Sequence, residues 1–300
     1  MSVKEKLTGV YPPIMSPFAE NGKLELGDLA FNIEKMNSTG VRGYMPLGSN
    51  GEFRSLSDEE ALEVLKTIVK VKGPDKVLMA GTGRESAYST IEFTKKAAGV
   101  GADFASVLTP HYYVKKMNDE ALIKYFSQVA DASPIPILIY CAPGFAAGVI
   151  ISPAAISELA KHPNIVGMKD TSKEDIAGYI KAVPKDSGFY VLAGSITKFL
   201  TGLKNGAIGG VLSISNYFPE QCCEVQTLFQ AGKLDEAEKL SAKLISLTDR
   251  ATGKHSVSGV KAAMNLVGYK GGYPRVPVLP LKPAELEELK SILKEEGYLK

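Results

Sequence analysis

Eight apolar runs of strand length are spaced along this chain, and segments with helical periodicity lie between them. The apolar runs are residues 10–15, 43–47, 76–81, 104–109, 135–140, 165–169, 189–193 and 209–214. Helical periodicity is clearest at residues 61–71, 86–100, 119–132, 152–161 and 197–205, and Ser57 with Glu60 forms a capping box before the first of these. A strand followed by a helix therefore recurs roughly every 25 to 35 residues.

This count predicts an α/β fold, a (β/α)8 TIM barrel in which eight parallel strands are enclosed by their helices. An open doubly wound sheet is the alternative. A dinucleotide-binding sheet of that kind has a G-x-G-x-x-G turn after its first strand, whereas residues 10–15 here lead into Ser16-Pro17-Phe18. The barrel is therefore the favoured fold.

More helical sequence follows the eighth apolar run than a minimal barrel requires. It occupies residues 219–250, 257–266 and 283–293, with a connector rich in Gly and Pro at 268–280. We therefore predict two regions. A catalytic barrel occupies residues 1–218, and a C-terminal helical region over 219–300 packs on the barrel or on a neighbouring subunit.

The composition excludes several classes of protein. The formal net charge is +2 and no dense stripe of Lys and Arg is present, which argues against nucleic acid as a partner. No apolar run has the length of a signal-peptide core or a membrane span, so we expect a cytoplasmic protein with no membrane partner. Cys141, Cys222, Cys223 and the three histidines lack the spacing of a disulfide framework or a metal site, so no metal is expected.

The sixth apolar run ends on an amine, in the sequence Asn-Ile-Val-Gly-Met-Lys-Asp over residues 164–170. An ammonium group is costly to bury, so an apolar site makes the neutral, nucleophilic amine accessible. A nucleophilic lysine of this kind is what a Schiff-base enzyme needs. Lys169 is therefore the first candidate for a catalytic residue, although a single lysine at a strand end more often marks only the exit of the chain into water.

Other reactive side chains follow the ends of neighbouring strands, where the active site of a (β/α)8 barrel lies. They are Gly48-Ser49-Asn50-Gly51-Glu52 after the second run, Thr109-Pro110-His111-Tyr112-Tyr113 after the fourth, Tyr140 at the end of the fifth and Gly194-Ser195 after the seventh. A phenol can move protons to and from a carbinolamine. The backbone N–H groups of the glycine-rich turn, with the amide of Asn50, could receive a small carboxylate.

These motifs together resemble the dihydrodipicolinate synthase / N-acetylneuraminate lyase family. The resemblance rests on Gly48 to Glu52, on Thr109 to Tyr113, on Tyr140 with Pro143 after it, on Val166 to Asp170, and on Arg275-Val276-Pro277, in this order along nearly the whole chain. It implies a (β/α)8 barrel with a C-terminal helical region. It also implies a homotetramer, a dimer of dimers, and a Schiff base with pyruvate or another 2-oxo acid.

The same resemblance assigns roles to individual residues. It makes Lys169 the Schiff-base lysine and Tyr140 the proton shuttle. Ser49 would link Tyr140 to Tyr112, which would reach into the site from an adjacent subunit. Ser49 and Asn50 would hold the carboxylate of pyruvate.

Departures from the family pattern bear on the substrate. Residues 140–148 lack the arginine that receives the second substrate in lysine-pathway synthases, and Gly194 is not followed by the glutamate of sialic acid lyases. The pattern is most similar to 4-hydroxy-2-oxoglutarate aldolases. In that comparison Thr171 contacts the substrate near the lysine and Gly194 lends a backbone contact. Leu212, within the eighth run, is a further expected substrate contact.

We therefore predict a class I aldolase that joins or cleaves pyruvate and an aldehyde such as glyoxylate, without a metal or an organic cofactor. The alternative within the family is the synthase that condenses pyruvate with aspartate semialdehyde. An alternative of another class is a non-catalytic protein that binds 2-oxo acids. A phosphosugar barrel is disfavoured, because Ser215-Asn216-Tyr217-Phe218 after the eighth run makes a poor anion cradle.

Overall fold

The computed structural model describes residues 1–299 and contains the eight predicted strands. They are β1 (Gly9–Tyr11), β2 (Gly43–Tyr44), β3 (Val77–Gly81), β4 (Phe104–Leu108), β5 (Ile137–Cys141), β6 (Ile165–Asp170), β7 (Tyr190–Ala193) and β8 (Gly209–Val211). They belong to one sheet in the order β1-β8-β7-β6-β5-β4-β3-β2. Strands and helices alternate along the chain, so the predicted (β/α)8 TIM barrel is confirmed.

The strands from β3 to β8 show why the sequence reads as continuous apolar runs. Each of them pairs in parallel with the next strand along the chain. Every residue of β3, β4, β5 and β6 is buried. Parallel strands covered on both faces select Val, Ile and Leu without the polar alternation of a half-exposed sheet.

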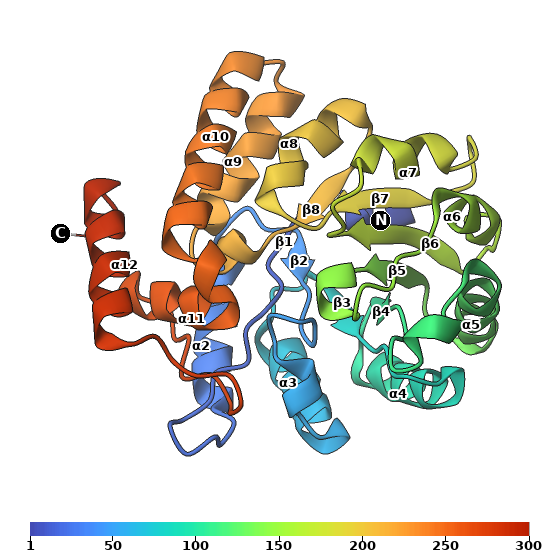
Figure 1. The fold of residues 1–300 in the computed structure, drawn as a ribbon, viewed down its shortest axis with the longest axis horizontal. Coiled ribbons are helices and arrows are strands. Elements are labelled where there is room, and N and C mark those ends of the chain that lie inside the picture. The colour runs from blue at the N-terminus through green and yellow to red at the C-terminus, as the bar shows by residue number, and fades with distance from the viewer. Residues whose placement is uncertain (300) are drawn as a thin grey trace. The chain divides into compact units, whose positions relative to one another are not determined.

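The chain forms two compact units. The first unit comprises residues 1–9 and 77–211, and the second comprises residues 10–76 and the chain from Leu212 onward. In the first unit, five helices follow the strands, and each packs against the next helix along the chain (Figure 1). They are α4 (Ala87–Val100), α5 (Asp119–Ala132), α6 (Pro153–Leu159), α7 (Ile176–Ala182) and α8 (Ile196–Asn205), and the short α1 (Val3–Leu7) precedes β1.

The second unit holds the remaining helices. They are α2 (Leu26–Asn37), α3 (Asp58–Val71), α9 (Pro219–Gln230), α10 (Leu234–Ala251), α11 (Ser256–Leu266) and α12 (Pro283–Glu295). Helix α2 packs on α3, α9 lies beside α10, and α12 contacts both α10 and α11 (Figure 1). The predicted helical residues 219–250 are thus two helices, because Gly232 between them adopts a positive φ of 74° that ends the first one. The division of the chain at residue 218 stays a prediction.

Two details of the strands and helices follow from local chemistry. The capping box before α3 is confirmed, since the Ser57 hydroxyl accepts the Glu60 N–H at 3.2 Å and the Glu60 carboxylate accepts the Ser57 N–H at 3.0 Å. Strand β1 ends earlier than predicted, because Pro12 and Pro13 follow it and have no N–H to donate to a neighbouring strand.

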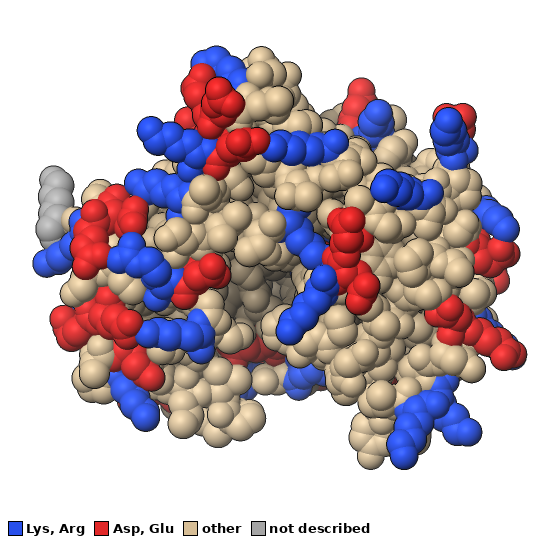
Figure 2. Space-filling view, turned by 45° about the horizontal axis from the view of Figure 1, so that its top comes forward, with Lys and Arg blue, Asp and Glu red and all other residues tan. Residues whose placement is uncertain are grey.

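The surface charges agree with the balanced composition. On the face drawn in Figure 2, basic and acidic side chains are interspersed rather than gathered by sign. Among residues 1–299, no helix combines the length and the hydropathy that crossing a membrane would need.

Candidate active site

Lys169 lies in the interior of the first unit, next to the end of β6. Its side chain belongs to a fully buried strand, and the residue is only 3% exposed. Successive side chains of a strand point to opposite faces, so the amine shares a face with Gly167, while Met168 and Asp170 occupy the other face. A buried amine at the carboxyl end of a barrel strand is placed where barrel enzymes carry their chemistry.

Tyr140 is the neighbour of Lys169 on the adjacent strand. The two residues are paired in the parallel register of β5 and β6, and Tyr140 is 4% exposed. The Lys169 amine lies 4.0 Å from the centre of the Tyr140 ring. The structure thus brings together two of the three predicted catalytic residues of this unit, Lys169 and Tyr140, with a phenol beside a buried nucleophile.

Thr171 and Gly194 continue the same surface just beyond β6 and β7. The N–H and the hydroxyl of Thr171 both donate to the Cys141 carbonyl, at 2.9 and 3.0 Å. The Gly194 N–H donates to the Asp170 carbonyl at 2.7 Å. The backbone just after Lys169 is therefore tied to both neighbouring strands, and the two predicted substrate contacts lie close together.

Gly194 is expected to tolerate no side chain. A Cβ atom there would lie 2.1 Å from Cγ2 of Thr171 and 2.5 Å from the Asp170 carbonyl oxygen, which is backbone and cannot rotate away. We predict that Gly194→Ala lowers the free energy of unfolding by about 1–3 kcal/mol and raises KM for the 2-oxo acid, as Thr171 is displaced. Urea denaturation and steady-state kinetics measure both effects. Gly144→Ala is the matched control, because nothing lies within 4 Å of its Cβ position.

An ion pair that was not predicted from the sequence supports the end of β6 from the opposite face. Asp170 is fully buried, and the Lys198 amine at the start of α8 lies 2.5 Å from its carboxylate. The other carboxylate oxygen accepts the Ser172 N–H at 2.9 Å, and Lys198 also donates to the Glu174 carbonyl. The charged pair fixes the loop that follows Lys169.

Cys141, which follows Tyr140, is not a candidate nucleophile. Burial raises the pKa of its thiol, and the nearby Asp170 carboxylate raises it further. Its sulfur lies 3.8 Å from the Tyr179 hydroxyl, which donates to the Ile151 carbonyl at 2.8 Å. A thiol in this setting packs and does not react.

The loop after Tyr140 is short of polar side chains. A 3₁₀ turn at Pro143–Phe145 is closed by a hydrogen bond from the Gly148 N–H to the Pro143 carbonyl, at 2.9 Å. Phe145 is exposed at its tip. Residues 141–151 carry no charged side chain, so this loop offers no cation to a second carboxylate.

In the second unit, Ser49 and Asn50 lie in a tight and strained turn. Leu47 before the turn and Glu52 after it both adopt the left-handed conformation, with φ of 62° and 51°. Such angles are costly for residues other than Gly and persist where the surrounding structure imposes them, often at functional sites. A Cβ on Gly51 would lie 2.9 Å from the Ile14 carbonyl oxygen, so this position requires glycine.

The turn contacts the segment that follows β8. The Asn50 amide donates to the Ser213 hydroxyl at 2.5 Å, and Ser213 follows the fully buried Leu212. Ser49 and Asn50 are themselves half-buried. The structure therefore brings three of the predicted substrate contacts together within this unit: Ser49, Asn50 and Leu212.

Tyr112 is held on an exposed loop of the first unit. It is 75% exposed, and its ring meets the Tyr113 ring edge to face at 5.1 Å. The N–H groups of His111 and Tyr112 both donate to the Glu85 carboxylate, at 2.9 and 2.8 Å. An exposed tyrosine on a fixed backbone suits a contact with a neighbouring subunit, and its role stays a prediction.

Among residues 1–299, no three His, Cys, Asp or Glu side chains group as metal ligands.

Comparison with known proteins bears on the family of the chain. The model of the dihydrodipicolinate synthetase family matches residues 6–296. A 4-hydroxy-tetrahydrodipicolinate synthase of Exiguobacterium is 34% identical over 290 residues, covering 96% of this chain and 97% of that protein. A probable mitochondrial 4-hydroxy-2-oxoglutarate aldolase of Emericella nidulans is 32% identical over 301 residues, covering 98% and 96%.

Solved structures are similar over the same length. A prophage protein of the dihydrodipicolinic acid synthase family from E. coli K12, solved in complex with pyruvate, is 28% identical with a TM-score of 0.89, covering 97% of this chain and 99% of that one. A monomeric dihydrodipicolinate synthase variant is 26% identical with a TM-score of 0.92, covering 100% of both chains. With its fold, its motifs and these matches, the chain belongs to the dihydrodipicolinate synthetase family, whose members are lyases and aldolases.

Proposed function

We propose that this protein is a class I aldolase in which Lys169 forms a Schiff base with a 2-oxo acid. One observation carries the proposal: a buried amine lies 4.0 Å from the ring of Tyr140, on the adjacent strand of a barrel. Membership of the family supports it, and so does the similar E. coli protein that was solved with pyruvate. The scheme requires no metal and no organic cofactor.

The proposed substrate for cleavage is 4-hydroxy-2-oxoglutarate. The Lys169 amine adds to the 2-oxo carbon and water leaves, which gives an iminium. A base removes the proton of the 4-hydroxyl group, the bond between carbons 3 and 4 breaks, and its electron pair enters the iminium to form an enamine. Glyoxylate departs, the enamine takes up a proton, and hydrolysis frees pyruvate and the lysine. Tyr140 is the group that moves the protons.

Ser49, Asn50, Thr171, Gly194 and Leu212 are proposed to bind the substrate. The carboxylate next to the 2-oxo group would be received by the turn at Ser49 and Asn50, through backbone N–H groups and the Asn50 amide. Ser49 would also link Tyr140 to Tyr112 of a neighbouring subunit in a homotetramer. Sedimentation of the purified protein tests the oligomeric state, and a monomer that retains full activity would contradict that part. A cytoplasmic location stays a prediction.

A second candidate is condensation of pyruvate with aspartate semialdehyde, because relatives such as the Exiguobacterium protein are named as synthases. Residues 140–148 lack the arginine that receives aspartate semialdehyde in lysine-pathway synthases, which disfavours this second partner. A third candidate is a non-catalytic binder of 2-oxo acids. Binding alone would not require a phenol beside a buried amine, so the pairing of Tyr140 with Lys169 disfavours it.

Assays with each aldehyde in turn discriminate between these functions. We expect kcat/KM with pyruvate and glyoxylate to exceed that with pyruvate and aspartate semialdehyde by about tenfold or more, since residues 140–148 lack the arginine that receives the larger aldehyde in lysine-pathway synthases. Product formation is followed by chromatography. The reverse preference would make the protein a synthase. Thermal stabilisation by pyruvate without any product would indicate a binding protein.

A further inference from the structure

Lys261 is a buried cation in the C-terminal part of the second unit. It lies on α11, and its side chain is 1% exposed. Its amine lies 2.6 Å from the Glu52 carboxylate and donates to the carbonyl oxygens of Ser16, at 2.7 Å, and Tyr273, at 2.6 Å. Two carbonyl acceptors and one ion-paired carboxylate therefore surround this buried cation.

Two of the residues that contact the Lys261 amine, Glu52 and Ser16, also contact the turn that carries Ser49 and Asn50. Glu52 is the left-handed residue that closes the turn, and its N–H donates to the Ser49 carbonyl at 3.1 Å. The Ser16 hydroxyl donates to the Gly51 carbonyl at 2.8 Å. By holding the Glu52 carboxylate and the Ser16 backbone, Lys261 fixes two successive residues of the turn.

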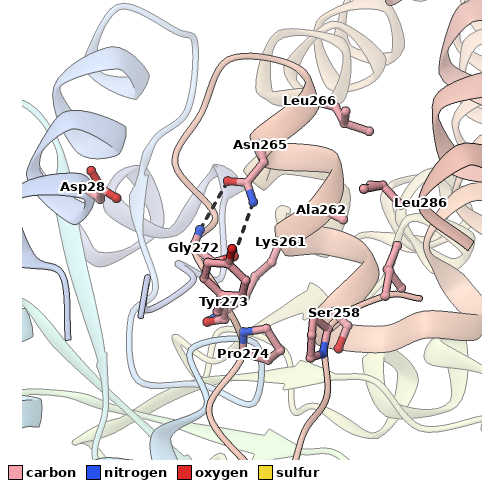
Figure 3. A pocket seen from close by; sticks show the side chains of 12 residues that line it. Asp28, Ser258, Lys261, Ala262, Asn265, Leu266, Gly272, Tyr273, Pro274 and Leu286 are labelled. Carbon is pink, nitrogen blue, oxygen red and sulfur yellow. Dashed lines mark hydrogen bonds between the residues drawn. The ribbon is translucent and has the colours of Figure 1, made fainter. Parts of the chain in front are cut away.

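The helix that bears Lys261 is itself anchored on the segment beside the turn. Asn265 lies one helical turn beyond Lys261, and its amide oxygen accepts the Gly271 N–H at 2.7 Å. It also accepts the Gly272 N–H at 3.3 Å (Figure 3). A Cβ on Gly271 would lie 2.2 Å from the Lys261 carbonyl oxygen, so the chain passes directly over α11. The segment continues to Tyr273, whose N–H donates to the Phe18 carbonyl at 2.8 Å.

Arg275 completes the enclosure of Glu52. Its N–H donates to the second Glu52 oxygen at 2.9 Å, while its guanidinium forms two hydrogen bonds with Glu60 at 2.7 and 2.8 Å. The Glu60 carboxylate therefore raises the pKa of Arg275 and keeps it charged. Lys261 and Arg275 both lie over the Phe18 ring, 4.5 and 4.3 Å from its centre.

We propose that Lys261 is a positioning residue, which holds the strained turn in the conformation that receives the carboxylate of the 2-oxo acid. The inference rests on the proposed function, because that function assigns the carboxylate to Ser49 and Asn50. Two left-handed residues, Leu47 and Glu52, bracket the turn, and such a conformation persists only where its surroundings impose it. The Lys261–Glu52 ion pair, together with the Arg275 N–H on the other Glu52 oxygen, holds this conformation at the Glu52 end.

Because Lys261 can lose its charge, its hold on the Glu52 carboxylate should depend on pH. Burial lowers the pKa of Lys261 from 10.5 to about 8, against the opposing effect of Glu52 and with a further lowering by Arg275. The charged and titratable groups around the amine are Glu52 and Arg275, with Glu60 beyond Arg275. Asp28 and the Tyr273 phenol line the adjoining pocket (Figure 3).

Stability and binding should respond to this titration in opposite directions. Between pH 8 and 10.5 the folded protein has lost the Lys261 proton that the unfolded chain still binds, so the contribution of this group makes unfolding harder as pH rises. Over the same range the neutral amine no longer holds the Glu52 carboxylate, so pyruvate binding weakens. If Lys261 had only a structural role, its titration would change the stability of the fold without weakening pyruvate binding.

The test compares the wild-type protein with Lys261→Met, with the double variant Glu52→Gln/Lys261→Met, and with Lys254→Met. In the double variant the amide oxygen can still accept the Arg275 N–H, and no buried carboxylate is left without a counter-charge. Lys254 is the control, since it is an exposed lysine of the same region paired with Glu288. The readouts are the thermal midpoint and the pyruvate concentration that gives half of the maximal borohydride-trapped adduct, from pH 7 to 10.

We expect the double variant to regain the thermal midpoint that Lys261→Met loses, yet to need about 10- to 100-fold more pyruvate at pH 7 with the maximal adduct unchanged. The difference from wild type should shrink above pH 8, and Lys254→Met should behave as wild type. A stable double variant with wild-type half-saturation, or a difference that is constant from pH 7 to 10, would overturn the positioning role alone. A wild-type protein that forms no adduct at all would overturn the proposed function, and this role with it.

Discussion

Replacing Lys169 with alanine is expected to abolish turnover, lowering kcat/KM by a factor of about 10⁴ or more while the fold is retained. The reason is that the amine is the nucleophile, and a methyl group cannot form the iminium that stores the electrons of the broken bond. Lys198, the lysine that supports the other face of β6, is committed to Asp170 and cannot substitute for it. Steady-state kinetics with single-turnover controls measure the loss.

Two controls separate chemistry from stability in this experiment. Lys161→Ala removes an exposed lysine of the same unit that pairs with Glu158, and it should leave kcat/KM unchanged. Urea denaturation should show Lys169→Ala to be folded, because removing a buried amine relieves a desolvation cost as well as leaving a cavity. A folded Lys169→Ala protein whose kcat/KM stays within tenfold of wild type would show that the amine is not the nucleophile.

Replacing Tyr140 with phenylalanine should lower kcat by a factor of about 10²–10⁴, which is the usual contribution of a positioned acid–base group. The ring remains, so its contact with the Lys169 amine and its packing in β5 are kept and only the hydroxyl is lost. Formation of the Schiff base should slow but still reach completion. Pre-steady-state trapping of the pyruvate adduct distinguishes this slow chemistry from a failure to bind.

The control for Tyr140→Phe is Tyr88→Phe, which removes the hydroxyl of an exposed tyrosine in the same unit and should have no effect. If kcat of Tyr140→Phe falls by less than threefold, another group must move the protons. If the variant binds no pyruvate, the phenol acts in binding and the assignment of roles is wrong.

The pairing of Lys169 with Tyr140 could be expected from the sequence because it depends on short-range rules. Consecutive parallel strands lie side by side, so residues at the carboxyl ends of two neighbouring apolar runs meet at one edge of the sheet. The apolar runs that became β5 and β6 are nearly unbroken, and their ends are clear. The register that joins the two residues follows from those ends.

Three helices were not predicted, and each has a local reason. Helix α1 has only five residues, too few for a helical period to emerge. In α2 the pattern is blurred because Asn32 is buried, where its amide pairs with the backbone of Lys270, and Phe31 is exposed. A hydropathy pattern assigns Asn32 to the exposed face and Phe31 to the buried face, which is the reverse of what the structure shows. Helix α7 is only seven residues long and contains Gly178, which gives too short a window for a period to emerge.

The support of the site could not be predicted, because it is built from contacts between residues far apart in the chain. The pairing of Glu52 with Lys261 and that of Asp170 with Lys198 join buried charges that look like ordinary surface residues in a sequence. The left-handed Leu47 runs against the preference of a residue with a Cβ, so only the folded backbone shows it. The positions of Lys169 and Tyr140 could thus be predicted from the ends of the strands. The contacts that hold the surrounding loops in place could be seen only in the folded structure.

The most direct test of a Schiff base on Lys169 is to incubate the protein with pyruvate, reduce with borohydride and map the adduct by mass spectrometry. Reduction of an iminium would leave a stable secondary amine that carries the three carbons of pyruvate. We predict one adduct, on Lys169, that is absent from Lys169→Ala. An adduct on another lysine, or none in the folded wild-type protein, would contradict the account.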